Sequence, residues 1–177
     1  MIEVDHSGAR LFSHVLAGTA VHTNGVAVDS KDNIVITGFY ESSINLFGET
    51  FRAITAGESG RISGAYLVKL DARGQVVFKI GSAPGSEAND VAVDASDHVL
   101  VTGASTGNAG FSRITEVTEF DAAGAGLRLF EMFPASGYGR GMAIAADACG
   151  SIFTSVNALD QASPGSALRA YVIKMAP

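Results

Sequence analysis

The sequence predicts an all-β protein in which a four-stranded unit recurs along 177 residues. The stretch GVAVDSKDNIVITG at 25–38 returns as DVAVDASDHVLVTG at 90–103, 65 positions further on. Short β-branched runs alternate with turn residues, and no long stretch has the 3.6-residue apolar period of a helix. The chain also holds 21 glycines, which suit a fold with many tight reversals.

The first unit divides into four expected strands in chain order. The first two, at 26–29 and 34–38, are joined by a polar turn, and the last two, at 65–70 and 76–80, by an Asp-x-x-Gly turn. Apolar residues in runs such as IVIT and YLVK are consecutive, which is typical of sheets covered on both faces. A repeated antiparallel unit of this kind describes a β-propeller blade.

Three such units are expected within a single domain, 1–177. The third copy, GMAIAADACGSIFTS at 141–155, is degraded, and Ala145 is expected where Asp29 and Asp94 stand. The units are unit 1 at about 17–80, unit 2 at 81–133 and unit 3 at 134–177, the last completed by strand 10–16.

Residues 25–80 resemble, along their whole length, the bacterial β-propeller repeat family labelled by its seven-bladed type, with blades of the NHL-like kind. Residues 90–133 match well and residues 141–175 weakly. The resemblance implies a β-propeller with about three four-stranded antiparallel blades, as a partial propeller or half of a six-bladed ring. Because a scaffold motif defines the family, it implies no catalytic residues.

The two ends of the pattern predict strands without a partner. Residues 2–5 read as the tail of a third strand and 11–16 as a fourth, whereas 170–175 read as a third strand that lacks its fourth. Three blades are too few to close a propeller. We therefore expect further blades of a longer chain, which the start inside a strand pattern favours, or a closed ring of two copies that pairs 10–16 with 170–175.

Composition excludes several classes of partner. The net charge is -6 and the 12 Lys and Arg form no run, so nucleic acid is not expected. No stretch of 18 apolar residues predicts a membrane span. The single Cys149 excludes an intramolecular disulfide and is expected to be buried. No signal peptide is visible at 1–20, although low Lys with high Gly, Ser and Ala suits an exported or cell-surface protein.

Two motifs that resemble catalytic or cofactor sites lack their structural context. VTGASTGNAG at 101–110 is similar to a dinucleotide-binding loop and GASTG at 103–107 to a nucleophile elbow, but a strand pattern follows instead of a helix. Tyr171 and Lys174 are one residue too close for the dehydrogenase pair, and His6, His14, His22 and His98 are scattered. We therefore predict no catalytic residues and no cofactor.

Other residues have a structural and a functional interpretation. Asp29, Asp32 and Asn33 offer oxygens for calcium, but Asp29 and Asp94 are expected to accept backbone N–H groups in their turns, so no metal site is predicted. Arg140 is expected to be solvated, with an anion contact as the alternative. The aromatic residues in and beside the unit 1 loop are expected to pack over the blade rather than form a binding patch: Phe39, Tyr40, Phe47 and Phe51.

The pattern also predicts which residues are buried. Residues 41–63 and 157–168 should be the most exposed. The expected core residues are Val26, Val28, Ile34, Ile36, Leu67, Val91, Val93, Val99, Val101, Ile144 and Ile152.

Function follows less directly, because propellers place their function in loops and in the central channel. We expect a non-catalytic scaffold or binding module with a protein or glycan ligand. The alternative is a lyase or hydrolase that acts on a polymer at the mouth of the channel.

Overall fold

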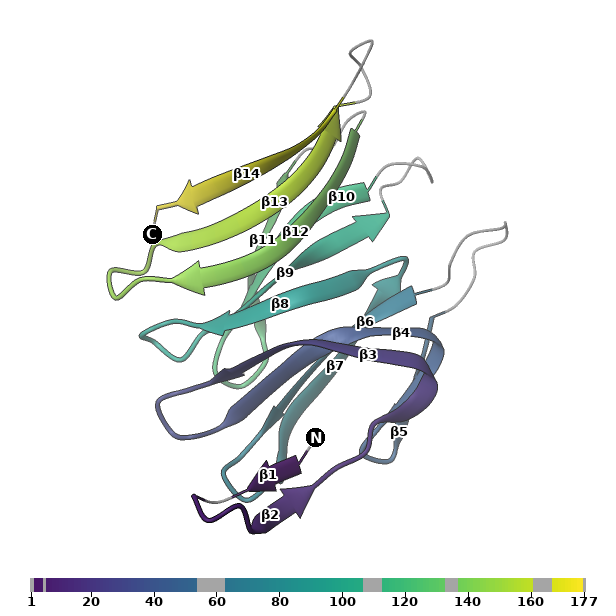
Figure 1. Ribbon diagram of the computed structural model, residues 1–177, viewed down its shortest axis with the longest axis vertical. Helices are drawn as coiled ribbons and strands as arrows, with labels where there is room; N and C mark the ends of the chain where they lie inside the picture. The colour runs from purple at the N-terminus through teal and green to yellow at the C-terminus, as the bar shows by residue number, and fades with distance from the viewer. Residues whose placement is uncertain are drawn as a thin grey trace.

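The computed structural model describes residues 2–4, 6–53, 63–106, 113–132, 137–160 and 167–176, and these form an all-β fold without helices (Figure 1). The strands are β1 (Ile2–Val4), β2 (Arg10–Ser13), β3 (Ala17–Val28), β4 (Ile34–Leu46), β5 (Glu49–Arg52), β6 (Ser63–Leu70), β7 (Val76–Pro84), β8 (Glu87–Val93), β9 (Val99–Thr106), β10 (Arg113–Phe120), β11 (Gly126–Met132), β12 (Gly137–Ala146), β13 (Ile152–Asp160) and β14 (Leu168–Met175).

Most neighbouring strands are antiparallel and follow one another in the chain. β1 and β2 form a hairpin, and unit 1 forms a sheet in the order β3-β4-β6-β7, with β5 paired to β4. In unit 2 the order is β8-β9-β10-β11, and in unit 3 it is β12-β13-β14. One parallel bridge between Arg113 and Tyr138 joins units 2 and 3 into a seven-stranded sheet.

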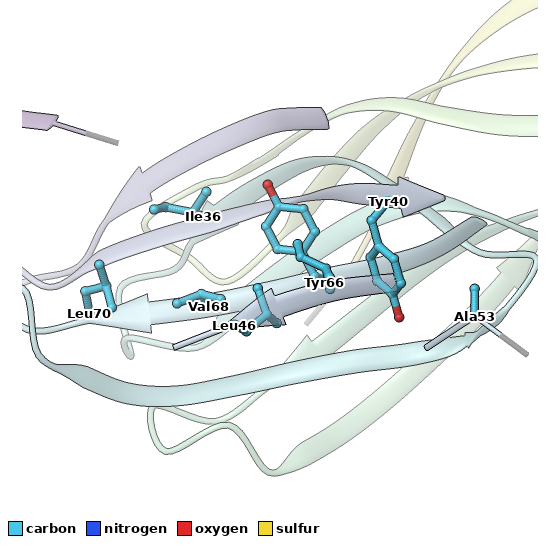
Figure 2. Close-up of a cluster of buried hydrophobic side chains, with 8 residues drawn as sticks. Ile36, Tyr40, Leu46, Ala53, Tyr66, Val68 and Leu70 are labelled. Atoms are coloured by element: carbon cyan, nitrogen blue, oxygen red, sulfur yellow. The ribbon is translucent and has the colours of Figure 1, made fainter. Parts of the chain in front are cut away.

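Both faces of the unit 1 and unit 2 strands carry packed apolar side chains. Ile36 and Val68 belong to a cluster with residues of β5 and of the β2 region (Figure 2). Val35 and Leu67 point the other way and pack with Val91 of unit 2. A third cluster, around Leu100, Val117 and Ile152, joins units 2 and 3. The stack therefore runs in series from the β1–β2 hairpin to β14, as Figure 1 shows.

The repeated Thr-Gly pair at the end of each duplicated stretch has a packing reason. A Cβ on Gly38 would lie 1.9 Å from the carbonyl oxygen of His22, and one on Gly103 would lie 1.9 Å from that of Glu87. Only glycine lets the first strand approach this closely. Thr37, just before Gly38, donates its hydroxyl to the carbonyl oxygen of Tyr66 at 2.7 Å and so ties the second strand to the third.

Core predictions are confirmed where a neighbouring unit covers the strand. Six of the expected residues are buried: Ile36, Leu67, Val91, Val99, Ile144 and Ile152. Ile34, Val93 and Val101 are half-buried. Val26 and Val28 are 65% and 56% exposed, so their expected burial is wrong. Their direct strand partners, Ile36 and Ile34, belong to the cluster on the side away from unit 2, so Val26 and Val28 lie on that face of β3. The short β1–β2 hairpin packs on this side and does not cover them.

The expected exposure of the two loop segments is also partly wrong. Within 41–63, Ile44 and Leu46 are fully buried because β4 continues past the expected strand and folds back as the β4–β5 hairpin. Within 157–168, Ala158 is buried in β13, whereas Leu168 is exposed. Residues 54–62 and 161–166 of these segments lie outside the described residues.

In unit 3 the turn residue is Asp147, not Ala145. The backbone N–H of Asp147 donates to Ser151, as that of Asp29 donates to Asn33. The register shift between Gly141 and Ala143 in β12 also occurs in β3 between Thr23 and Gly25 and in β8 between Ala88 and Asp90. Ala143, and not Gly141, is therefore the counterpart of Gly25, and the sequence alignment of unit 3 was displaced by two positions. Cys149 lies in this turn and is exposed, so its expected burial is wrong.

Candidate functional site

A charged cluster lies where the first strands of units 2 and 3 begin, and β10 contributes to it. Glu87 opens β8, and its carboxylate accepts two hydrogen bonds from Arg113, Nη1 to Oε2 at 2.7 Å and Nη2 to Oε1 at 2.8 Å. Arg140 of β12 brings its Nη2 within 3.2 Å of Glu87 Oε2. The side chain of Glu87 is only 6% exposed.

Asn89 fixes the second arginine of this cluster. Its Oδ1 accepts a hydrogen bond from Arg140 Nη2 at 2.9 Å, and its Nδ2 donates to the carbonyl oxygen of Gly141 at 2.8 Å. The Nε atom of Arg140 is buried and has no hydrogen-bond partner among the described residues. The side chain of Arg140 is nevertheless 31% exposed, so solvent reaches part of it.

The electrostatics of the cluster favour a second anion. Two guanidinium groups face the single carboxylate of Glu87, and the Arg113 guanidinium also lies 5.9 Å from the centre of the Tyr138 ring. The hydrogen bonds to Glu87 raise the pKa of Arg113, although burial works the other way. Two guanidinium groups against the one carboxylate of Glu87 give these three side chains a net positive charge.

A cavity of about 90 Å³ lies between the sheets of units 1 and 2, next to this cluster. Glu87 and Glu116 line it together with the hydroxyl side chains of Thr37, Ser82 and Ser86. Burial raises the pKa of Glu116, although a hydrogen bond from Ser105 opposes the shift. Ligand pockets usually measure about 300–1,000 Å³, so this cavity has room for a few waters but not for a sugar ring.

The opposite end of each sheet carries the aspartate turns. Asp29 Oδ1 accepts the backbone N–H groups of Lys31 and Asn33, both at 2.9 Å, and Asp94 Oδ1 accepts those of Ser96 and His98. The turn role expected for Asp29 and Asp94 is therefore confirmed. The same turn recurs at Asp71, Asp121 and Asp147.

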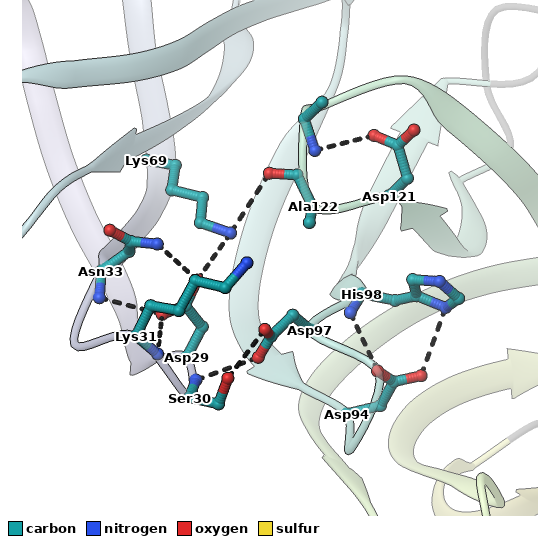
Figure 3. Close-up of polar contacts among 11 residues, drawn as sticks. Asp29, Ser30, Lys31, Asn33, Lys69, Asp94, Asp97, His98, Asp121 and Ala122 are labelled. Carbon is teal, nitrogen blue, oxygen red and sulfur yellow. Dashed lines mark hydrogen bonds and ion pairs between the residues drawn. The ribbon is translucent and has the colours of Figure 1, made fainter.

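A buried ion pair distinguishes the turn of unit 1 (Figure 3). Lys69 Nζ lies 2.8 Å from Asp29 Oδ2, and both side chains are 1% exposed. Burial alone would raise the pKa of Asp29, but the hydrogen bonds from Lys69 and Asn33 outweigh it and hold that pKa far below its usual value. A calcium ion at Asp29 would have to displace this ammonium group.

The structure settles the other residues considered in the sequence. Phe39 stacks on His22, Phe47 packs against His14, and Tyr40 is fully buried, so the expected packing of the aromatic loop is confirmed. Arg140 is bound to Glu87 and Asn89 rather than simply solvated. The two glycine motifs begin in strand β9, while residues 107–112 lie outside the described residues.

Sequence reasoning missed Glu87, Asn89 and Arg113, although one of them left a signal. An asparagine stands directly before both copies of the repeated stretch, as Asn24 and Asn89. Asn24 Nδ2 donates to the carbonyl oxygen of Ala88, just as Asn89 does to Gly141. Each asparagine thus links the first strand of its unit to the first strand of the next. Glu87 and Arg113 have no such echo.

Comparisons with known proteins add little. No protein-family model matches the chain, and no curated protein matches it. Among solved structures, the chain is similar to a Bacteroides caccae protein of unknown function, with 12% sequence identity and a TM-score of 0.36. That match covers 93% of this chain and 65% of the other. Among the described residues, no helix is long and apolar enough to cross a membrane.

Proposed function

We propose that this chain is a β-propeller module that acts as a non-catalytic binding scaffold. The observation that carries this proposal is the pair of asparagine links, from Asn24 to Ala88 and from Asn89 to Gly141. They hold the first strands β3, β8 and β12 next to one another while the units pack face to face. In a propeller, the first strands of successive blades surround the central channel in this way.

The binding surface of the module is the end that carries Glu87, Arg113 and Arg140. Its excess guanidinium charge suits a carboxylate, which arginine recognises with two parallel hydrogen bonds. The ligand is therefore an acidic segment of a protein or an acidic glycan. A surface role fits the adjacent cavity, which is too small to enclose a ligand of either kind.

Arrays of acidic and neutral peptides and glycans test this function. Hits are titrated against the wild type and Arg140→Gln, with Arg73→Gln as the matched control, because Arg73 is exposed in a turn at the other end of the sheet. We expect Arg140→Gln to weaken binding at least tenfold and Arg73→Gln to leave it unchanged. Equal affinity for all three proteins would reject this surface.

A polymer-acting lyase or hydrolase is the second candidate, and the position of Glu116 favours it. This carboxyl group faces the same cavity as Glu87, and its raised pKa suits a general acid. A screen of glycosidic, ester and peptide substrates tests the enzyme, with Glu116→Gln as the inactive variant. Turnover that Glu116→Gln preserves would exclude this carboxyl group as the general acid.

A further inference from the structure

A second cluster, formed by Asp94, His98 and Glu119, lies at the turn end of unit 2, away from the arginine cluster. Glu119 is six residues along β10 from Arg113, about 20 Å at the usual rise of a strand. The ligand atoms of the three side chains lie within 4.8 Å of one another. Glu119 is almost fully buried, and His98 is 33% exposed.

Comparison with unit 1 reveals a reversal of charge at this place. Leu70 pairs with Ile34 as Phe120 pairs with Val99, so Lys69 and Glu119 occupy equivalent positions. In unit 1 the lysine ammonium group neutralises Asp29. In unit 2 the equivalent position holds a second carboxylate beside Asp94.

A histidine replaces asparagine in the same turn. Asn33 and His98 occupy the fifth turn position, and the backbone N–H of each donates to the turn aspartate. Asn33 Nδ2 also donates to Asp29 Oδ2, whereas His98 places its Nδ1 3.4 Å from Asp94 Oδ2 and 2.9 Å from Glu119 Oε1. The turn of unit 1 thus has a lysine beside its aspartate, whereas the turn of unit 2 has one imidazole between two carboxylates.

Each carboxylate in this cluster is held by one oxygen and directs the other towards His98. Asp94 Oδ1 accepts two backbone N–H groups, at 2.8 and 2.9 Å, while Oδ2 faces the imidazole. Glu119 Oε2 accepts Arg128 Nε at 2.6 Å, while Oε1 faces the imidazole. Such partners orient metal ligands in proteins.

We propose that Asp94 Oδ2, His98 Nδ1 and Glu119 Oε1 bind a zinc ion. A tetrahedral zinc with bonds of about 2.0–2.2 Å holds its ligand atoms about 3.4 Å apart. His98 and Asp94 already have this separation, while the 2.9 Å between His98 and Glu119 has to open and the distance between Asp94 and Glu119, which is within 4.8 Å, has to adjust to it. Water takes the fourth position on the exposed side of His98. The imidazole binds as the neutral ring, so any proton on Nδ1 leaves to solvent.

This site differs from the sequence-based expectation of no metal. The sequence places Asp94 and His98 in one turn, but it does not bring Glu119, 25 positions later in the chain, beside them. Calcium is a poor fit, because it takes six or more oxygen ligands.

Calorimetric titration of the chelator-treated 177-residue chain with zinc chloride tests the proposal. The informative variants are His98→Asn and Glu119→Lys, because each installs the residue that unit 1 holds at the same place. We expect one zinc per wild-type chain and at least tenfold weaker binding in each variant. His6→Asn is the matched control, since His6 is exposed and lies outside the cluster, and its affinity should equal that of the wild type.

Cobalt gives an independent readout, because tetrahedral Co²⁺ has a strong visible absorption that should appear with the wild type and be lost with His98→Asn. Should Glu119→Lys melt below the wild type, Glu119→Gln supplies the result for this position. The proposal is overturned if the wild type takes up no zinc, or if His98→Asn and the folded position-119 variant bind zinc as tightly as the wild type.

Discussion

At the scale of single residues, the buried pair of Lys69 and Asp29 carries the largest electrostatic consequence. Neither charge is in contact with water, and the ammonium group also donates to the carbonyl oxygen of Ala122 in unit 2 at 3.2 Å. The pair thus joins the unit 1 turn to its neighbour. Replacement of Lys69 alone leaves the buried carboxylate of Asp29 without a cation, and this costs more free energy than the intact pair contributes.

Lys69→Met should therefore lower the free energy of unfolding by about 3–5 kcal/mol. Lys31→Met is the control, because Lys31 is exposed, and it should change stability by no more than about 0.5 kcal/mol. Urea titration of the three proteins measures both values. Equal midpoints for Lys69→Met and the wild type would contradict the role assigned to this pair.

Asp29 also predicts a dependence on pH. Its pKa is lower in the folded protein than the ordinary 3.8, so its contribution to stability is complete above about pH 4 and is lost as the pH falls further. Asp29→Asn has no carboxylate to be protonated at this position, so its melting temperature should depend less on pH between 4 and 2. Melting curves of both proteins across this range make the comparison, and parallel pH profiles would contradict the prediction.

For Glu116 we expect stability to depend on pH in the opposite direction. Burial raises its pKa in the folded protein above the ordinary 4.5, so the protonated form stabilises the fold and that contribution is lost as the pH rises. Glu116→Gln should gain in melting temperature relative to the wild type between pH 4 and pH 7. A difference in melting temperature that stays constant over this range would show that Glu116 titrates normally.

At the scale of strands and turns, local patterns determined what could be predicted. The strands at 34–38, 65–70 and 76–80 were expected from β-branched runs and turn residues, and each is part of a longer strand in the structure. The extension of β4 into the β4–β5 hairpin was not predicted, because that stretch has no counterpart in unit 2. Nor was the turn at Asp147, because the sequence of unit 3 was aligned on Gly141, whereas strand pairing makes Ala143 the counterpart of Gly25.

The candidate sites needed the structure, for a related physical reason. Glu87, Arg113 and Arg140 come from three strands and meet only when units 2 and 3 are side by side. Likewise, Glu119 meets His98 only through the pairing of β9 with β10. The sequence alone could indicate the turn residues, whose partners lie in the same turn, and the repeated asparagine, whose partner lies in the next unit.

Two paired residues in unit 1 show that the apolar pattern of the sequence does not by itself determine burial. Val26 and Ile36 are direct partners on β3 and β4, yet Val26 is 65% exposed and Ile36 only 5%. Ile36→Ala should cost about 2–4 kcal/mol through the cavity that it leaves. In the monomer, Val26→Ala should cost no more than about 0.5 kcal/mol. Chemical denaturation at concentrations at which the chain is monomeric compares the two, and similar losses there would contradict the exposure of Val26.

At the scale of the whole molecule, each unit offers the next the same kind of face. Leu67 of unit 1 packs on unit 2, and Val117 of unit 2 packs on unit 3. Val172 of β14 has the equivalent position in unit 3 and is 80% exposed. At the other end of the stack, Val26 and Val28 are equivalent to Val91 and Val93, which receive unit 1. The two exposed faces are therefore of the two types that meet inside the stack.

We accordingly expect the 177-residue chain to associate head to tail, with the Val172 face of one copy on the Val26 face of another. Val172→Lys should shift the molecular mass measured by light scattering towards the monomer. Leu129→Lys should not, because Leu129 is 56% exposed but lies in β11 of unit 2, away from both ends of the stack.

The number of copies in the assembly then shows whether it is a closed ring or an open chain. A contact between two different faces either closes into a ring or continues as an open chain. A discrete dimer would support the closed ring of two copies that the sequence pattern predicts. That ring needs β14 of one copy to replace β1 at the edge of β2 in the other, so removal of residues 1–5 should tighten the dimer. Larger species mean that two copies do not close. A monomer at all concentrations would contradict the stacking of these faces.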